Sequence, residues 1–473
     1  MSGSAWHGAA QGVRWTATAS AVTAALQALQ LVVLARLLAP AEFGLFATVA
    51  VVTGLTTFVA EAGLGPALVR RTDAPRQLQG TAHAVSLALG LACAALLYGA
   101  AAPLAQFYGR PALAPLVQAA AGVFLLQPLG LVFAHLLQRD LAFKALAGVD
   151  ISTAVVATAV AVAAAALGYG AASLVAAQVA AALVRSLLLL ALGVPRYGLQ
   201  LGFDRTEARY LWRFGAFQIG DSWLGYLHSQ LDVLLLGKLA GAEALGLYYA
   251  AKQLAYKPLQ LINPVVTKVA LPAFARVQHE PARLKRGYLA VVAALALVQV
   301  PVYGGLCVLA GPVLALVLGP GWQAAAPVLQ LLALCMLLRS TINPVGSLLL
   351  ARGHADRSLY WNLGVLALMA PTLALGAMGG ALGMAAASLA AIAVLHVPAW
   401  AVLVRPHCGA TFAEYFGPQG RRLLAGVLCF APALLPVPTA GRLALAAAGL
   451  VAYAAWHRRE LAGLLRPPGS AAA

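Results

Sequence analysis

The chain is a succession of apolar stretches, each about as long as a membrane-spanning helix, joined by short polar segments. A helix needs roughly 20 mostly apolar residues to cross the hydrocarbon core of a bilayer, because each residue adds only about 1.5 Å. Charged residues make up 10% of the chain, whereas about a quarter of the residues of a soluble protein are charged. These charges are too few and too clustered to solvate a globular surface. The sequence therefore predicts an all-α polytopic membrane protein.

We expect about fourteen transmembrane helices, with no loop large enough to hold a separate catalytic domain. The first 15 residues lack the basic segment and cleavage site of a signal peptide, so the first apolar run is expected to be a retained span. The predicted spans are 15–36, 43–65, 79–103, 112–136, 149–168, 171–194, 214–237, 245–271, 287–310, 324–350, 359–378, 380–404, 422–437 and 440–456.

Basic residues fall mainly on one side of these predicted spans. The net charge of +17 could indicate nucleic-acid binding, but the 31 Lys and Arg are spread in small groups and form no single basic face. If the N-terminus is cytoplasmic, most of them lie in cytoplasmic segments. The outside segments then contain only Arg36, Arg110, Lys238 and Arg442. This bias follows the positive-inside rule and predicts an even number of spans with both termini cytoplasmic. No nucleic-acid partner is expected.

The sequence repeats itself at an offset of about 202 residues. The segment LARLLAPAEFGLF at 34–46 matches LGKLAGAEALGLY at 236–248, with Gly44 on Gly246. Glycine-rich turns precede both 171–194 and 380–404. We therefore expect two pseudo-symmetric six-helix lobes, at 1–200 and 201–404, followed by a terminal helix pair and cytoplasmic tail at 405–473. Both halves begin on the same side, so the repeat is parallel, and such proteins usually bind their substrate between the halves.

Polar stripes occupy corresponding helices of the two halves. The predicted helix 15–36 has Gln27 and Gln30 on a polar face, and polar residues of 214–237 continue the same pattern. Carboxylates, an imidazole and amides are costly in lipid, so this second stripe indicates either a water-filled cavity, where the groups could couple transport to an ion, or interhelical hydrogen bonds. Its coupling candidates are Asp221, His228, Gln230 and Asp232.

The predicted helix 245–271 combines lysines, tyrosines and prolines. Tyr249, Lys252, Tyr256 and Lys257 lie beside prolines at 258 and 264, which are expected to break the helix where it lines a cavity. An ammonium attracts phosphate, and aromatic faces stack on sugar rings. These four residues are therefore candidates for binding an anionic, sugar-bearing substrate. The alternative is that both lysines snorkel from a helix end.

Four further ionisable residues lie at membrane depth or at a helix end. Arg339, in the polar, proline-interrupted stretch CMLLRSTINPVG, could hold a phosphate through two hydrogen bonds and joins the substrate-binding candidates. Glu61 at the end of 43–65 could pair with a cation in the cavity or with the basic segment that follows it. Arg185 and Lys268 are interpreted as residues that snorkel near the end of a span or that lie at a misplaced span boundary.

Several motifs are absent from the sequence. It has no GxxxxGK[ST] motif for binding nucleotide phosphates. Its five cysteines form no CxxC pair, and no His, Cys and Glu set has metal-ligand spacing. We expect no catalytic residues, no cofactor and no metal, and therefore a protein that is not an enzyme.

The segment at 13–71 resembles the opening of polysaccharide-biosynthesis flippases of the multidrug/oligosaccharidyl-lipid/polysaccharide (MOP) exporter superfamily. The residues that carry this resemblance are Trp15, 37–40 (LLAP), Phe43-Gly44, 61–64 (EAGL) and 68–70 (LVR). Later stretches also fit, including SQLDVLLLGKL at 229–239, LGPGWQAAAPVLQLLAL at 318–334 and the turn around Gly353. The resemblance covers nearly the whole chain.

This resemblance implies a fourteen-helix protein that opens alternately to the two sides of a bacterial cytoplasmic (inner) membrane. Its substrate would be an undecaprenyl-pyrophosphate-linked oligosaccharide for lipopolysaccharide or exopolysaccharide biosynthesis, and polysaccharide polymerase and export machinery would be its partners. A cationic cavity is thought to hold the pyrophosphate in such proteins, and Lys252, Lys257 and Arg339 are the candidates here. The alternatives are a cation-coupled multidrug antiporter of the same superfamily and a membrane glycan polymerase. Interior basic residues disfavour the antiporter, and short outer loops disfavour the polymerase.

Overall fold

The computed structural model describes residues 3–61, 68 and 75–465. Within these ranges, the side chains of 3–11, 13, 213–222, 263–269, 355–356, 358–359 and 463–465 are not described. Every regular element in the described part of the chain is a helix, as the hydropathy pattern predicts. The chain divides into two compact units, Met1–Gly246 and Leu247–Ala473.

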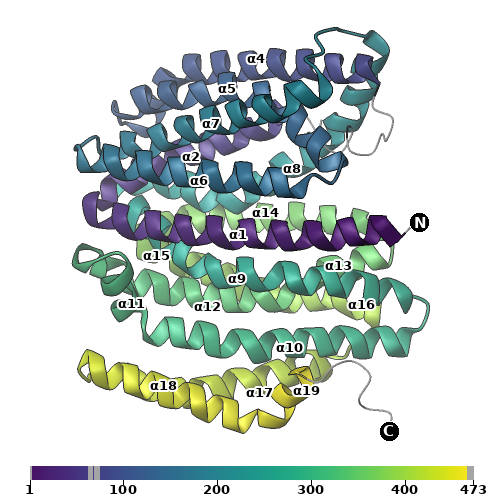
Figure 1. Ribbon diagram of the computed structural model, residues 1–473. Coiled ribbons are helices and arrows are strands. Elements are labelled where there is room, and N and C mark those ends of the chain that lie inside the picture. Colours follow the sequence, from purple (N-terminus) through teal and green to yellow (C-terminus); the bar gives the residue numbers. More distant parts are fainter. Residues whose placement is uncertain (1–2, 62–67, 69–74, 466–473) are drawn as a thin grey trace. The chain divides into compact units, whose positions relative to one another are not determined.

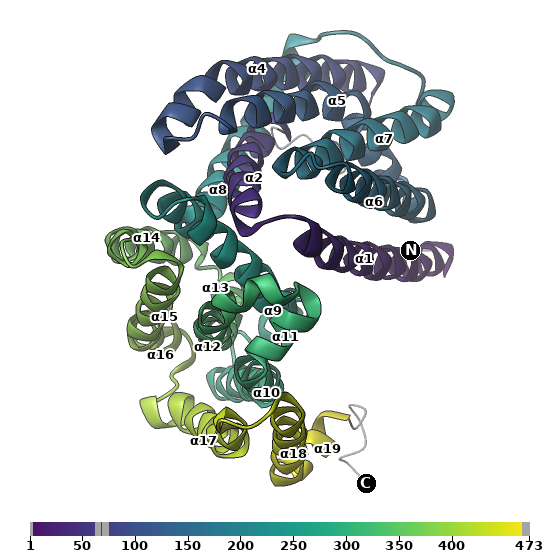
Figure 2. The ribbon, with the colours of Figure 1, turned by 90° about the vertical axis from the view of Figure 1, so that its left-hand side faces the viewer.

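The first unit is a bundle of long helices. They are α1 (Gly3–Leu37), α2 (Pro40–Glu61), α4 (Arg76–Tyr108), α5 (Leu113–Arg139), α6 (Phe143–Ala166), α7 (Ala171–Tyr197) and α8 (Arg205–Leu239). Helix α5 packs along both α4 and α7, and α6 packs between α7 and α1 (Figures 1 and 2). Helix α8 packs against α2 and α4. Its first turn is capped by the carboxylate of Asp204, which accepts hydrogen bonds from the backbone N–H groups of Thr206 and Glu207.

The second unit contains the remaining helices. They are most of α9 (Ala242–Arg276), then α10 (Pro281–Val308), α11 (Ala310–Val317), η1 (Pro320–Ala325), α12 (Ala326–Ile342), α13 (Pro344–Ala351), α14 (Ala355–Ala377), α15 (Gly380–Ala399), η2 (Trp400–Val404), α16 (Arg405–Cys408), α17 (Phe412–Phe430), η3 (Ala431–Leu434), α18 (Thr439–Trp456) and α19 (Arg458–Leu465). Helix α12 lies between α10 and α15, and α17 packs against both α10 and α18 (Figure 1).

Among the described residues, 11 helical segments are long and apolar enough to cross a membrane. Each of the predicted spans overlaps a helix, but α8, α9 and α17 are not among these segments. Helix α17 begins at Phe412 and ends at Phe430, so it starts ten residues before the predicted span 422–437. The total of fourteen spans and the division into lobes at 1–200, 201–404 and 405–473 stay predictions.

Large apolar side chains point outward from many of these helices. Leu91, Leu96 and Leu375 are 62%, 71% and 71% exposed, in the middle or last turns of apolar helices. In water such a surface would cause aggregation. In a bilayer it faces lipid at no cost, so the protein is a multi-pass membrane protein.

The two copies of the repeated segment contact each other in the structure. Helices α2 and α9 begin at Pro40 and Ala242, two positions that the sequence repeat aligns. A Cβ atom on Gly44 would overlap the carbonyl oxygen of Ala242, and one on Gly246 would overlap the carbonyl oxygen of Pro40. The first turns of the two helices therefore cross with their backbones in contact, each glycine facing the start of the other helix.

The prolines in the two stretches that carry the substrate-binding candidates have different effects on the helices. Helix α9 continues through residues 258 and 264, so the prediction of a broken helix there is wrong. Pro258 removes one backbone donor, but the flanking turns keep the helix intact. The hydrogen-bond ladder is interrupted instead at Asn343, between α12 and α13, where Pro344 lacks a backbone donor while Asn343 keeps helical angles (φ −56°, ψ −36°). Arg339 lies one turn before that break.

Candidate functional site

Arg339 and Tyr256 come together between α12 and α9. The guanidinium carbon of Arg339 lies 5.7 Å from the centroid of the Tyr256 ring. This distance is within the range of a cation–π interaction, which holds the guanidinium plane near the ring while its N–H groups remain able to bind an anion. Both side chains are half-buried. The structure thus brings together two of the five residues predicted to bind substrate.

A second polar contact lies on α9 one to two turns earlier. The amide nitrogen of Gln253 donates a hydrogen bond of 2.9 Å to the hydroxyl oxygen of Tyr249. Lys252 is half-buried on the same helix. Since Tyr249 and Tyr256 are seven residues apart, two turns of helix place them on one face. Two aromatic groups with polar hydroxyls therefore follow this side of α9.

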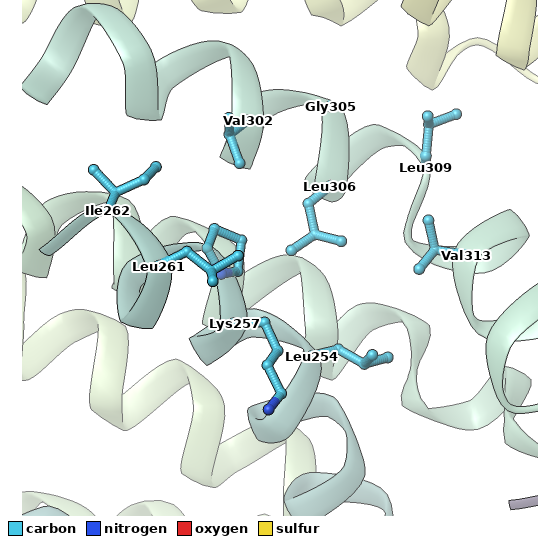
Figure 3. Close-up of a pocket in the computed structure, with 10 residues that line it drawn as sticks. Leu254, Lys257, Leu261, Ile262, Val302, Gly305, Leu306, Leu309 and Val313 are labelled. Atoms are coloured by element: carbon cyan, nitrogen blue, oxygen red, sulfur yellow. The ribbon is translucent and has the colours of Figure 1, made fainter. Parts of the chain in front are cut away.

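Lys257 borders an apolar pocket between α9, α10 and α11. The pocket has a volume of about 500 Å³. Its other lining residues are Leu254, Pro258, Leu261, Ile262, Val302, Gly305, Leu306, Leu309 and Val313. Figure 3 shows the ammonium of Lys257 pointing away from Val302 and Leu306. The lysine thus contributes its aliphatic stem to the pocket and its charge to the pocket's edge, which is the arrangement of a snorkelling side chain.

Glu61 lies in a different, polar cavity within the first unit. The cavity has a volume of about 220 Å³ and forms where the last turn of α2 meets the second half of α5, the start of α6 and the second half of α7. Its lining residues are Glu61, Gln127, Leu131, Ala134, His135, Gln138, Leu146, Asp150, Arg185, Ser186 and Leu189. The amide nitrogen of Gln127 donates to a carboxylate oxygen of Glu61 at 3.4 Å.

The interpretation of Arg185 as a snorkelling residue is wrong. Its guanidinium pairs with the carboxylate of Asp150 at 2.5 Å, and both side chains line the polar cavity. Gln127, His135 and Gln138 were also missed as site residues. Their spacing of eight and three places them on one face of α5, and this pattern could have identified the cavity from the sequence.

The loop that follows α5 is anchored close to the cavity lining residue Gln138. Asp140, which follows α5, accepts hydrogen bonds from Arg139 and from the hydroxyl of Tyr197 at the end of α7. Burial raises the pKa of Asp140, but the hydrogen bonds from Tyr197 and Arg139 and the charge of Arg196 outweigh it, so the pKa lies below its ordinary value. The ends of α5 and α7 are therefore tied together next to the cavity.

The remaining candidate residues lie on α1 and α8. Gln27 is exposed, whereas the side-chain oxygen of Gln30 accepts a hydrogen bond of 3.5 Å from Thr158 on α6. His228, Gln230 and Asp232 are half-buried on α8. The side chain of Asp221 lies outside the described residues. Among the described residues, no group of three His, Cys, Asp or Glu converges as metal ligands.

Comparison with known proteins supports the resemblance noted in the sequence. Residues 33–327 match the family described as "Polysaccharide biosynthesis protein". The chain is 31% identical to the teichuronic acid biosynthesis protein TuaB of Bacillus subtilis, over 89% of this chain and 88% of TuaB. It is 28% identical to the lipopolysaccharide biosynthesis protein WzxC of Escherichia coli, over 85% of this chain and 82% of WzxC.

Solved structures share the fold at low sequence identity. The lipid II flippase MurJ, in an inward closed conformation, superimposes with a TM-score of 0.76 at 11% identity, over 96% of this chain and all of MurJ. A multidrug resistance transporter of the MATE family, in an inward-facing conformation, superimposes with a TM-score of 0.61 at 17% identity, over 80% of this chain and 93% of the transporter. The family match, the relatives and this shared fold agree, and the chain belongs to the polysaccharide biosynthesis protein family.

Proposed function

We propose that the chain is a flippase that moves undecaprenyl-pyrophosphate-linked oligosaccharide repeat units across the bacterial cytoplasmic membrane by alternating access. Three relatives are named for building or transporting surface polysaccharides: TuaB, WzxC and the succinoglycan biosynthesis transport protein ExoT of Rhizobium meliloti. The fold shared with MurJ supports a membrane protein that can expose one site to both sides. The repeat units would serve lipopolysaccharide or exopolysaccharide biosynthesis, with polymerase and export machinery as partners.

The observation that carries this proposal is the combination of cationic, aromatic and apolar groups along α9. Arg339 over Tyr256 offers charge and a stacking face, which suits a pyrophosphate joined to a sugar. Lys257 follows Tyr256 in the chain and lies at the edge of the apolar pocket. A lipid-linked substrate has the same three parts: an anionic linkage, sugar rings and a hydrocarbon chain. Lys252 and Tyr249 extend the polar side of this site.

We assign the hydrocarbon part of the substrate to the pocket between α9 and α10. Gly305 lines this pocket, and a Cβ atom there would meet the nearest ring atom of Phe430 at 4.0 Å, which is ordinary contact. Gly305→Val therefore adds side-chain volume at the wall of the pocket, and the ring of Phe430 leaves room for the added Cβ atom. The matched control is Gly364→Val on α14, where a Cβ atom meets no atom within 4 Å. Transport by Gly305→Val is expected to fall about tenfold while the control keeps the wild-type rate.

Complementation of a deletion strain tests the proposed function and its site together. The wild-type gene should restore surface polysaccharide and remove lipid-linked oligosaccharide that accumulates in the inner leaflet. Arg339→Gln should fail to do so, because removing one charge from an anion site costs on the order of 2 kcal/mol or more. Arg283→Gln, which changes an arginine whose side chain is 65% exposed, is the matched control. Normal polymer in the deletion strain, with altered resistance to cationic drugs, would instead favour the antiporter.

A further inference from the structure

Two helices of the first unit are bound to each other at their C-terminal ends by basic side chains. The guanidinium of Arg110, just after α4, donates a hydrogen bond of 2.9 Å to the carbonyl oxygen of Gly237 in the last turn of α8. In return, the ammonium of Lys238 donates to the carbonyl oxygen of Phe107 in the last turn of α4, and it lies 4.4 Å from the centroid of the Phe107 ring. We call these reciprocal contacts the α4–α8 clasp.

The clasp satisfies groups that each helix leaves open at its C-terminal end. The last carbonyl groups of a helix have no partner within it and carry the negative end of the helix dipole. Each helix receives a cation from the other, so both ends are bound by a charged donor. The ion pairs in the described part of the chain include neither Arg110 nor Lys238. In addition, the Nη1 atom of Arg110 is buried without a hydrogen-bond partner.

The clasp joins the two copies of the internal repeat. At the offset of the repeat, the bounds of α8 correspond to those of α1, and the start of α9 corresponds to that of α2. Helix α8 is therefore the first helix of the second copy, whereas α4 belongs to the first copy. Arg110 and Lys238 are two of the four basic residues that the sequence places on the outer side, where such residues are disfavoured. Their meeting at one contact indicates a local role.

Helices α2, α4 and α8 pack closely beneath the clasp. A Cβ atom on Gly237 would lie 3.3 Å from the ring of Tyr108 and 3.5 Å from the hydroxyl oxygen of Thr48 on α2. Thr48 is only 3% exposed. The clasp therefore lies over a position that solvent does not reach while these helix ends stay together.

Two further hydrogen bonds hold α8 to these neighbours, and both have neutral partners. At the start of α8, the backbone N–H of Asp204 donates to the hydroxyl oxygen of Thr81 on α4 at 2.9 Å. Midway along α8, the hydroxyl of Tyr226 donates to a backbone carbonyl oxygen of α2 at 3.3 Å. Hydrogen bonds from charged donors are roughly twice as strong as neutral ones. The clasp differs from these contacts because an anion can compete for its donors.

We propose that the α4–α8 clasp is a latch on the predicted outer side of the protein, and that the pyrophosphate group of the substrate opens it. Phosphate oxygens bind an ammonium or a guanidinium more strongly than a neutral carbonyl oxygen does, because they carry the opposite charge. The Nη1 atom of Arg110 is a donor without a protein partner that such a group can use. After translocation the pyrophosphate lies among the outer headgroups, at the depth predicted for the clasp. The latch rests on the proposed function, which supplies this ligand.

A cysteine placed beneath the clasp measures how often it opens. Thr48→Cys is introduced into the full-length protein, which is purified in lipid nanodiscs, and its reaction with a water-soluble maleimide is followed. A buried thiol reacts only during local opening, so the rate reports the open fraction. Adding Lys238→Gln or Arg110→Gln should raise the rate about tenfold, since each removes a hydrogen bond from a charged donor. The wild type gives the background from the five native cysteines.

Two matched variants separate a latch from a general loosening of the fold. Lys238→Arg keeps a charged donor at the same position and should keep the labelling of Thr48→Cys slow. Arg442→Gln removes an arginine that is also predicted outside but lies on α18, and it should leave the rate unchanged. If Lys238→Gln labels no faster than its parent, or if Arg442→Gln labels as fast as Lys238→Gln, the clasp is not a latch.

Inorganic pyrophosphate tests the opening ligand without any translocation. It should speed the labelling of Thr48→Cys severalfold, whereas sodium chloride at the same ionic strength should not. The effect should disappear in Lys238→Gln, whose clasp is already broken. Labelling that pyrophosphate leaves unchanged would overturn opening by the substrate's anion. Failure of the wild-type gene to complement a deletion strain would contradict the proposed function instead, while the labelling rates still decide whether the clasp opens.

Discussion

At the scale of single residues, Glu414 offers the clearest pH-dependent contact. It lies in the first turn of α17, ahead of the predicted span, where the ammonium of Lys285 on α10 lies 2.6 Å away. The hydrogen bond from Lys285 and those from the backbone and hydroxyl of Thr411 lower the pKa of Glu414 from 4.5 to about 2. A pKa lowered by folding contributes stability that is fully present above pH 4.5 and is lost as the pH falls toward 2.

Glu414→Gln should therefore lower the unfolding midpoint at neutral pH, and the difference from the wild type should narrow from about pH 5 to about pH 3. The measurement is thermal unfolding of the detergent-solubilised protein across this range. A difference that stays constant with pH would mean that the carboxylate charge does not stabilise the contact between α10 and α17.

The residues of the candidate site were predicted unequally well from the sequence. Arg339 and Tyr256 were selected because each lies in a polar stretch of an apolar helix, and the structure places them 5.7 Å apart. The sequence does not predict the role of Arg185, because it does not show which residue the arginine pairs with. Its partner Asp150 is 35 residues away on another helix, and only packing brings them together.

At the scale of helices, the crossing of α2 and α9 depends on two glycines. The atoms that a side chain would meet there are backbone carbonyls of Pro40 and Ala242, which cannot rotate away as a flexible side chain can. Gly44→Ala and Gly246→Ala should each destabilise the protein by about 1–3 kcal/mol through overpacking. Thermal unfolding of the purified variants measures this effect. Gly99→Ala on α4, where a Cβ atom meets nothing within 4 Å, is the control and should stay near the wild-type midpoint.

The positions of the helices can be predicted from the lengths of the apolar runs, but the positions where the helices are interrupted cannot. Runs of about 20 apolar residues locate the helices, because unpaired backbone groups are too costly in lipid for any other regular structure. Proline alone was a poor guide to breaks. Helix α9 passes through Pro258, whereas the chain between α12 and α13 is interrupted at Asn343 before Pro344. At Asn343 the neighbouring Ser340 and Thr341 bond to backbone carbonyls of their own helix, which competes with the regular ladder.

At the scale of the whole molecule, the distribution of basic residues predicts how the chain crosses the membrane. Reporter fusions measure this directly. A green fluorescent protein fused after Arg458 should fluoresce, because its fusion point is expected to be cytoplasmic. Alkaline phosphatase fused after Arg110 should be active, because the loop between α4 and α5 is expected outside. Active phosphatase at Arg458 would reverse the predicted orientation or change the number of spans to odd.

The internal repeat connects sequence and architecture at this scale. An offset of about 202 residues aligned the starts of two helices, and the structure places those two starts against each other at Gly44 and Gly246. The lobe boundaries could not be derived in the same way. Sequence similarity locates repeated elements, whereas a lobe is defined by which helices pack together, and α8 packs against α2 and α4 of the first unit.

Translocation can be measured directly in a defined membrane. Purified protein is reconstituted into vesicles that contain a labelled undecaprenyl-pyrophosphate-linked oligosaccharide, and an external glycosidase reports which leaflet holds the sugar. The wild type is expected to expose the inner-leaflet pool to the enzyme, while Arg339→Gln and empty vesicles leave it protected. Equal protection with and without the wild-type protein, under every imposed ion gradient, would contradict the assignment of this chain as a lipid-linked oligosaccharide flippase.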